Sequence, residues 1–212
     1  MKTKSKALLL TLCAVLLVAA SMLGTMAYLT STDEVENTFT VGQVKITLDE
    51  AQVTPDGKPV EGAARVKANS YKLLPGQTYT KDPMVTVLKG SEASYIKMTV
   101  TFSKAKELDD IFAPNGADMT KIFNGYDKTS WTYKGNTKDT AADTRTYEFW
   151  YKEAVSAPTA DIALDALFES ITVPGSITNE QLKTIEGMTI TVNAYAIQAD
   201  GFTDAADAWS KY

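Results

Sequence analysis

The chain has 212 residues, of which 44% are apolar and 22% charged, a composition typical of a globular protein rather than a disordered tail or a polybasic nucleic-acid binder. Histidine is absent and Cys13 is the only cysteine, which excludes histidine-dependent triads, histidine-ligated zinc and thiol catalysis. Because the formal net charge is -5, we expect no nucleic-acid partner, and contact with a membrane only through the N-terminal segment.

The first thirty residues have the layout of a secretory signal peptide. Lysines near the start precede an apolar run, and small residues close the segment at Thr25 and Ala27. We expect cleavage after Ala27, which removes residues 1–27 and leaves a secreted, extracellular chain that starts at Tyr28. The alternative is an uncleaved membrane anchor, because the apolar stretch from Ala7 to Leu29 is long enough to span a bilayer with some tilt.

The mature chain is predicted to form mainly strands. Alternation of apolar and polar residues is clearest at 95–102, where Ile96, Met98, Val100 and Phe102 share one face. The predicted strands, in chain order, are 39–48 with a phase slip at Gly42-Gln43, 77–88 interrupted by Pro83, 95–102, 147–151 and 188–197.

Helices are predicted to be short and peripheral. One is expected to begin at the cap Ser103 and to run to Phe112, and others are expected at 160–168, from Thr178, and at 204–209. The polar stretch 115–144 is predicted to be the longest loop. Together these elements predict a mainly β fold, a two-sheet antiparallel β-sandwich of jelly-roll type over residues 39–212, preceded by an N-terminal segment, 28–38.

Three stretches of the sequence resemble a known family. They are Gly24–Thr30, Asn37–Leu48 and Lys72–Gln77, and they are similar to the exported TasA/camelysin family of Gram-positive bacteria. A fourth stretch, Ala194–Phe202, looks like the C-terminal end of related exported proteins, whereas 104–174 offers no residue-level match. The chain departs from the family in having only Gly24 where members often carry a glycine cluster before the cleavage site.

The resemblance implies a structural role. Members carry a signal peptide that is processed by a SipW-type signal peptidase, and their jelly-roll subunits polymerise head to tail, with themselves or related matrix subunits, into biofilm fibres. In that mechanism the N-terminal segment of one mature subunit completes a sheet in the next, which agrees with the tendency of an unpaired strand to add to an open sheet edge.

We assign the donor strand to 28–37 and allow it to extend into the strand that follows. Its apolar residues are Tyr28, Leu29, Val35, Phe39 and Val41. The alternative is a disordered leader, because the acidic side chains within 30–37 would discourage pairing with a sheet edge.

Enzymatic function is not expected. Camelysin-like relatives have been labelled metalloproteases, but this chain has no His-Glu-x-x-His stretch and no histidine. Glu148 and Glu153 near Trp150 and Tyr151 could be imagined as a glycosidase pair, but the alternation around Glu148 is that of an ordinary strand.

No cofactor or metal site is predicted either. The carboxylates of Asp109 and Asp110, and those of Asp200, Asp204 and Asp207, could offer oxygen ligands to calcium, but their spacing lacks the EF-hand pattern and is more typical of a solvated face.

One further function class stays open beside the structural one. A monomeric extracellular adhesive or binding module would use the polar stretch 115–144, where Trp131 and Tyr133 could stack on sugars or could equally cover the core.

Overall fold

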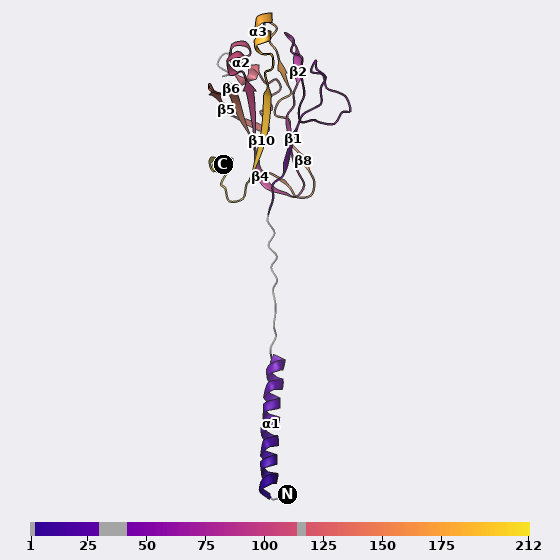
Figure 1. Cartoon of the computed structure of the whole chain (residues 1–212), viewed down its shortest axis with the longest axis vertical. Coiled ribbons are helices and arrows are strands. Elements are labelled where there is room, and N and C mark those ends of the chain that lie inside the picture. Colours follow the sequence, from indigo (N-terminus) through magenta and orange to yellow (C-terminus); the bar gives the residue numbers. More distant parts are fainter. Residues whose placement is uncertain (1–2, 30–41, 114–117) are drawn as a thin grey trace. The chain divides into compact units, whose positions relative to one another are not determined.

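The computed structural model describes residues 3–29, 42–113 and 118–212. The chain divides into two compact units, Met1–Val41 and Gly42–Tyr212. The described part of the first unit is one helix, α1 (Thr3–Leu29), which includes the predicted cleavage site at Thr25, Ala27 and Tyr28 (Figure 1). Cleavage there stays a prediction. Among the described residues, no helix is long and apolar enough to cross a membrane.

The second unit is mainly β, with antiparallel sheets and a few short helices. Its strands are β1 (Ile46–Asp49), β2 (Thr78–Thr80), β3 (Met84–Val87), β4 (Ser91–Ser103), β5 (Trp131–Asp139), β6 (Thr144–Tyr151), β7 (Val155–Ala157), β8 (Ile162–Ala163), β9 (Ser170–Thr172) and β10 (Ile190–Gln198). Its helices are α2 (Ala105–Ile111), the 3-10 helix η2 (Met119–Lys121), α3 (Asn179–Thr184) and α4 (Ala205–Ser210).

Three antiparallel sheets are present in the described residues. The five-stranded sheet has the order β10-β4-β6-β5, with β7 also paired to β4; the others have the orders β1-β3-β8 and β2-β9. In Figure 1, β10 runs beside β1, which belongs to a different sheet.

The long strand β4 carries the centre of the core. Ile96, Met98, Val100 and Phe102 are buried on one face, as the alternation predicts, and side chains of this kind contribute about 1.5–3 kcal/mol each when fully buried. Their neighbours include an aromatic cluster around Phe123, whose ring centroid lies 4.6 Å from that of Phe168 and 5.2 Å from that of Tyr147. The core is therefore formed by side chains of the sheet strands and also by side chains of the segments that connect the strands.

Several sequence predictions are confirmed. The strand predicted at 77–88 divides into β2 and β3 around Pro83, and those at 147–151 and 188–197 correspond to β6 and β10. The helix predicted from Thr178 is α3, which starts with a capping box between Thr178 and Gln181. The turn at 204–209 is α4, whose cap is the side chain of Asp204.

The strand predicted at 39–48 is confirmed only in its last part. Residues 39–41 lie outside the described residues, 42–45 belong to no strand, and β1 begins at Ile46, so the predicted slip at Gly42-Gln43 precedes the strand. The segment nonetheless follows β4, because the Glu92 amide donates a hydrogen bond to the Gln43 carbonyl at 3.0 Å.

The helix predicted at 160–168 is wrong. Residues 162–163 form β8, and the amides of Leu164 and Leu167 donate to the carbonyls of Val85 and Pro83 at 2.8 and 3.0 Å. The segment therefore runs along β3, and this pairing with residues far away in the sequence satisfies its backbone. Of the apolar residues with helical spacing in this segment, Leu164, Leu167 and Phe168 are buried and Ile162 is exposed, since an extended segment can also turn apolar residues to the core.

The loop predicted at 115–144 is also wrong in its second half, which forms β5. This strand lies at a sheet edge with one face in solvent, which explains its polar sequence. Its register against β6 shifts between Tyr133 and Gly135.

The prediction that Ser103 caps a helix is wrong. The cap of α2 is Lys104, and the Ser103 hydroxyl accepts a hydrogen bond from the Thr189 amide at 2.8 Å.

Candidate functional site, a groove between two strand edges

The site is bounded by two strands that are each paired on one side only. β10 pairs with β4 and β1 pairs with β3, and in the described part of the chain no strand pairs with the other edge of either. The two strands lie side by side but belong to different sheets. Each edge strand presents backbone N–H and C=O groups that can pair with an added strand. At the end of β1 part of this edge is occupied, because the Leu48 carbonyl accepts a hydrogen bond from Lys67 Nζ and Glu50 pairs with Val66.

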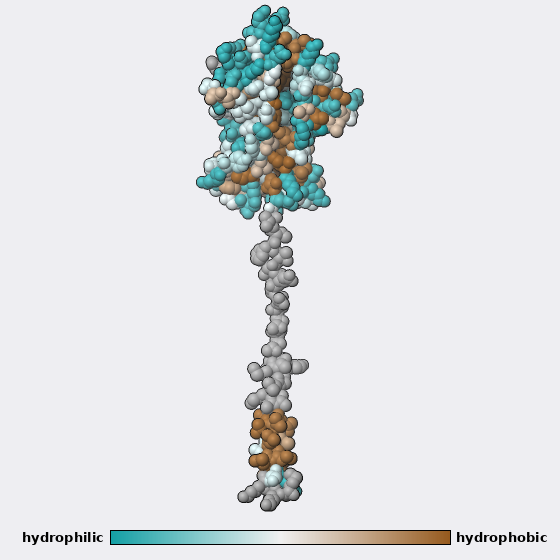
Figure 2. All heavy atoms as spheres, viewed as in Figure 1, coloured by the Kyte–Doolittle hydropathy of each residue, from teal (hydrophilic) through white to brown (hydrophobic). Residues whose placement is uncertain are grey.

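A groove of about 1420 Å³ lies between these walls. Figure 2 shows hydrophobic residues in a band along the middle of the Gly42–Tyr212 unit, in the region where the groove runs. The apolar lining comes from β1, β10, α3 and the core beneath; it includes Ile46, Leu48, Leu73, Phe102, Ile171, Leu182, Ile190, Val192 and Ala194.

The lining residues of β10 are only half-buried. Ile190, Val192 and Ala194 lie at alternate positions, so they share one face of the strand and pack against the edge of the core. Asn193 points to the other face and is exposed. An apolar side chain that entered the groove from outside would cover surface that the described residues leave partly open.

A buried polar cluster forms part of the opposite wall. The Lys81 ammonium lies 2.5 Å from Glu50 Oε2, and both side chains are more than nine-tenths buried. Asn69 donates from Nδ2 to Glu50 Oε1 at 3.0 Å. Burial, and after it the charge of Glu50, raises the pKa of Tyr71 well above its usual value, and the Tyr71 hydroxyl donates to the Thr80 carbonyl at 3.1 Å.

Arg65 fixes the irregular segment that follows β1. Its guanidinium donates from Nε to Asp49 Oδ1 at 2.5 Å and from Nη1 to Asp82 Oδ2 at 2.8 Å, and it also reaches the backbone carbonyls of both residues. Asp82 in turn accepts a hydrogen bond from the Ala51 amide at 2.7 Å. This side of the groove is therefore held in one arrangement by charge-assisted hydrogen bonds.

The exposed charges at the groove are mostly positive. Asp49, Glu50 and Lys81 are engaged in the contacts above. Lys67, Lys72 and Lys183 line the groove with exposed side chains, and the Lys67 ammonium also donates to the Leu48 carbonyl. Glu186 is the exposed acidic residue in the same lining. The mouth of the groove thus favours an acidic segment over a basic one.

The geometry fits an extended polypeptide. An open strand edge offers backbone pairing, alternate pockets hold side chains that point inward, and surface cations orient an acidic chain. Searches of protein-family models, of curated proteins and of solved structures found no match to this chain.

The predicted donor residues can be placed only in part. Tyr28 and Leu29 are the last residues of α1, whereas Val35, Phe39 and Val41 lie outside the described residues. The groove was not predicted from the sequence. Its walls come from segments far apart in the chain, and the alternation within 188–197 was its only signal.

Asp109 and Asp204, two of the carboxylates considered as calcium ligands, have other partners. Arg145 donates to both carboxylate oxygens of Asp109, at 2.9 and 2.7 Å, and Lys138 lies 2.9 Å from Oδ2. Asp204 accepts a hydrogen bond from the Asp207 amide at 2.8 Å as the cap of α4. In the described ranges no group of three or more His, Cys, Asp or Glu side chains is arranged to hold a metal ion.

The residues considered for sugar chemistry lie in the sheet. Trp131 is fully buried, its indole N–H donates to the Asp165 carbonyl at 3.0 Å, and the idea that it stacks on a sugar is wrong because its faces lie in the core. Tyr133 packs against Phe149 at 5.4 Å between ring centroids. Glu148 accepts a hydrogen bond from the Trp150 indole at 2.6 Å, whereas Glu153 is exposed beyond the end of β6.

Proposed function

We propose that the protein is a secreted structural subunit of an extracellular, biofilm-type matrix, similar to the TasA/camelysin family. After a SipW-type peptidase removes the signal peptide, residues 28–37 of one subunit add as a strand to the groove of the next. The fold proposed for this role is a two-sheet sandwich of jelly-roll type. The observation that carries the proposal is the apolar groove between the open edges of β1 and β10.

The length and pattern of the donor segment suit this groove. β10 is 9 residues long, and 28–37 is of similar length. Leu29 and Val35, and beyond the segment Phe39 and Val41, are separated by even numbers of residues, so they share one face of an extended strand. The polar residues on the same face are Ser31, Asp33 and Asn37. Glu34 and Glu36 fall on the opposite face.

The acidic side chains, which argue against pairing with an ordinary edge, suit this one. On the face that points away from the apolar lining, Glu34 and Glu36 would lie toward the mouth of the groove, where the exposed cations are Lys67, Lys72 and Lys183. A strand that is contributed by each subunit to the next gives a head-to-tail contact, which extends into a filament and does not close.

The test is to compare the mature chain that begins at Tyr28 with one that begins at Thr38, by sedimentation and electron microscopy. We expect filaments from the first and monomers from the second. Filaments from both chains would contradict the donor assignment. A mature chain that stays monomeric with its N-terminus intact would instead support the alternative, a monomeric binding module.

A matched pair of substitutions refines the test. Val35→Asp places a charge on the face that we expect to enter the groove, whereas Thr32→Asp places the same charge on the opposite face. We expect Val35→Asp to abolish filament growth and Thr32→Asp to permit it. Equal effects of the two substitutions would mean that 28–41 does not bind as a regular strand.

A further inference from the structure

The strongest unassigned chemistry lies in the buried cluster of Glu50, Asn69 and Lys81. Glu50 joins β1 to the segment that follows it through paired backbone hydrogen bonds with Val66, and Lys81 follows β2. The Glu50 carboxylate holds the Lys81 ammonium on one oxygen, at 2.5 Å, and the Asn69 amide nitrogen on the other, at 3.0 Å. An amine and a primary amide are therefore held on one carboxylate; the amine and the carboxylate are buried, and the Asn69 amide is partly buried.

The Asn69 amide is fixed and polarised. Its Nδ2 also donates to the Ala51 carbonyl at 2.8 Å, and its Oδ1 accepts a hydrogen bond from the Val53 amide at 3.0 Å. A backbone N–H aimed at an amide oxygen stabilises the negative charge that develops there when a nucleophile attacks the carbonyl carbon. The Glu50 carboxylate is placed to accept a proton from an amine and to deliver one to the amide nitrogen.

We propose that Lys81 and Asn69 react to form an intramolecular amide crosslink, with Glu50 as the proton carrier. Glu50 removes a proton from the Lys81 ammonium, and the free amine attacks Cγ of Asn69. The bond from Cγ to Nδ2 then breaks, and the new bond from Cγ to the lysine nitrogen remains. Both protons lost by the lysine nitrogen leave with the amide nitrogen as ammonium, and Glu50 ends as it began.

The surroundings favour this reaction over an ordinary ion pair. Lys81 and Glu50 are 7% and 8% exposed, which keeps water from competing as nucleophile. The charge-assisted contacts of Arg65 hold the segment that carries Asn69 against Asp49 and Asp82, and a reaction between two positioned groups gains from this fixed geometry.

The product would have a clear structural effect. It would join the irregular segment after β1 to the residue that follows β2, so one wall of the groove would be held together by a covalent bond. Cys13 is the only cysteine of the chain and lies in α1, so the Gly42–Tyr212 unit has no disulfide with which to do the same.

Mass spectrometry of the purified, folded full chain tests the proposal. We expect an intact mass below that of the sequence by one ammonia. After denaturation, trypsin should fail to cut after Lys81 and should release Ala68–Lys72 joined to Leu73–Lys89 as one branched peptide. A full sequence mass with Ala68–Lys72 and Leu73–Lys81 as separate linear peptides would overturn it. Loss of ammonia with two linear peptides would also overturn it, because it would indicate a cyclic imide formed by Asn69 with its own backbone.

Two variants separate the chemistry from the fold. Lys81→Arg keeps a cation opposite Glu50 but cannot form the amide, so we expect its full sequence mass and no branched peptide. Glu50→Gln keeps both reacting groups and removes the proton carrier, so we expect the branched peptide to be lost. A branched peptide at the wild-type level in Glu50→Gln would overturn the role of Glu50, and ammonia loss retained in Lys81→Arg would overturn the crosslink.

Discussion

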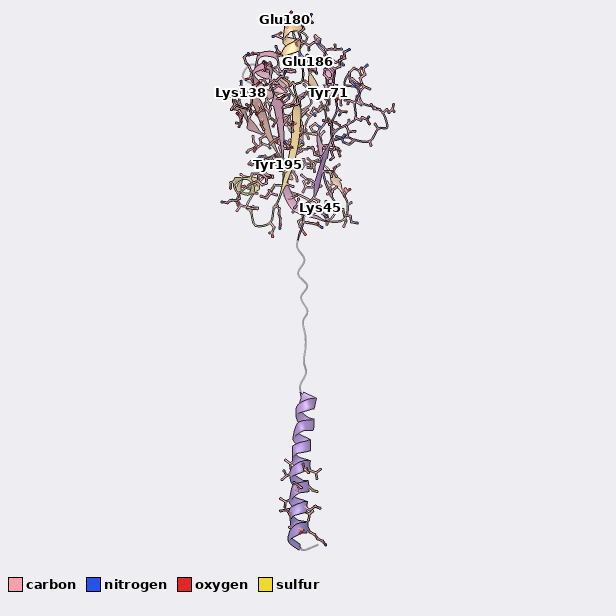
Figure 3. The ribbon with its side chains drawn as sticks, in the orientation of Figure 1. Lys45, Tyr71, Lys138, Glu180, Glu186 and Tyr195 are labelled. Atoms are coloured by element: carbon pink, nitrogen blue, oxygen red, sulfur yellow. The ribbon has the colours of Figure 1, made fainter. Side chains whose placement is uncertain are left out.

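At one edge of the five-stranded sheet lies β5, and at the other lies β10. β5 carries Lys134 and Lys138, its register shifts next to Gly135, and the Asp109 carboxylate of α2 binds Lys138. β10 carries no charged residue and borders the apolar groove. In the view of Figure 3, Lys138 and Tyr71 lie on opposite sides of β10.

The difference teaches which edge is available for association. Lysines and a bulge are the devices that protect an edge strand from pairing with other chains, and β5 has both. β10 has neither, and its half-buried side chains leave room for a partner strand. One sheet therefore combines an edge that resists addition with an edge that favours it.

The largest expected effect on stability comes from removing the Asp109 carboxylate, which binds Lys138 of the edge strand β5. Asp109→Asn takes the partner from the buried Arg145 guanidinium, and an unpaired buried charge costs about 3–5 kcal/mol in free energy of unfolding. Asp110→Asn is the matched control, because Asp110 is exposed and lies 3.9 Å from Lys106. Urea unfolding measures both, and we expect the control to change by less than about 1 kcal/mol. Similar losses in the two variants would contradict the importance of the buried cluster.

Acid is expected to reduce the stability that Asp109 contributes beside β5. Burial alone would raise the pKa of Asp109, but the hydrogen bonds from Arg145 and Lys138 outweigh it and lower the pKa below its usual value. The charged carboxylate therefore stabilises the fold above the unfolded-state pKa of about 3.9, and this contribution is lost as the pH falls through the lower folded-state value. We expect the stability difference between wild type and Asp109→Asn to shrink below about pH 4 in urea titrations. A difference that does not vary with pH would contradict this.

The bulge in β5 gives the smallest expected effect. Gly135 has φ of 130°, in which an L side chain is strained, although a Cβ there would meet no atom within 4 Å. We expect Gly135→Ala to lower the free energy of unfolding by about 1 kcal/mol. In the control Gly175→Ala, the added Cβ would lie 3.7 Å from the Gly76 Cα, an ordinary contact, and we expect no loss. Equal results in thermal or urea unfolding would mean that the bulge is not strained.

The sequence predicts elements whose signals are local. The alternation of Ile96, Met98, Val100 and Phe102 predicts β4, and the capping box at Thr178 predicts the start of α3. β5 could not be predicted in this way because its outer face is polar and its register shift breaks the alternation. The prediction of a helix at 160–168 fails because an extended chain that faces the core and a helix can bury apolar residues with the same spacing.

The groove and the buried cluster depend on contacts between distant residues. Glu50 meets Lys81 across 31 positions and Asn69 across 19, and no local pattern marks any of the three. The charge complementarity between the acidic segment 28–37 and the groove depends on the fold, because only the fold brings Lys67, Lys72 and Lys183 to one lining. The donor strand is thus a prediction from the sequence, and the fold offers a candidate acceptor for it.

The most direct test of the proposal that β10 is the acceptor edge compares two variants, each with a glutamate at one of two neighbouring residues of β10. Ala194→Glu places a carboxylate in the groove, whereas Asn193→Glu places it on the exposed opposite face. Both mature chains would be checked for folding by circular dichroism and then followed by sedimentation and electron microscopy. If β10 is the acceptor edge, Asn193→Glu forms filaments like the wild type and Ala194→Glu stays monomeric. Filaments of wild-type length and yield from a folded Ala194→Glu chain would contradict the account.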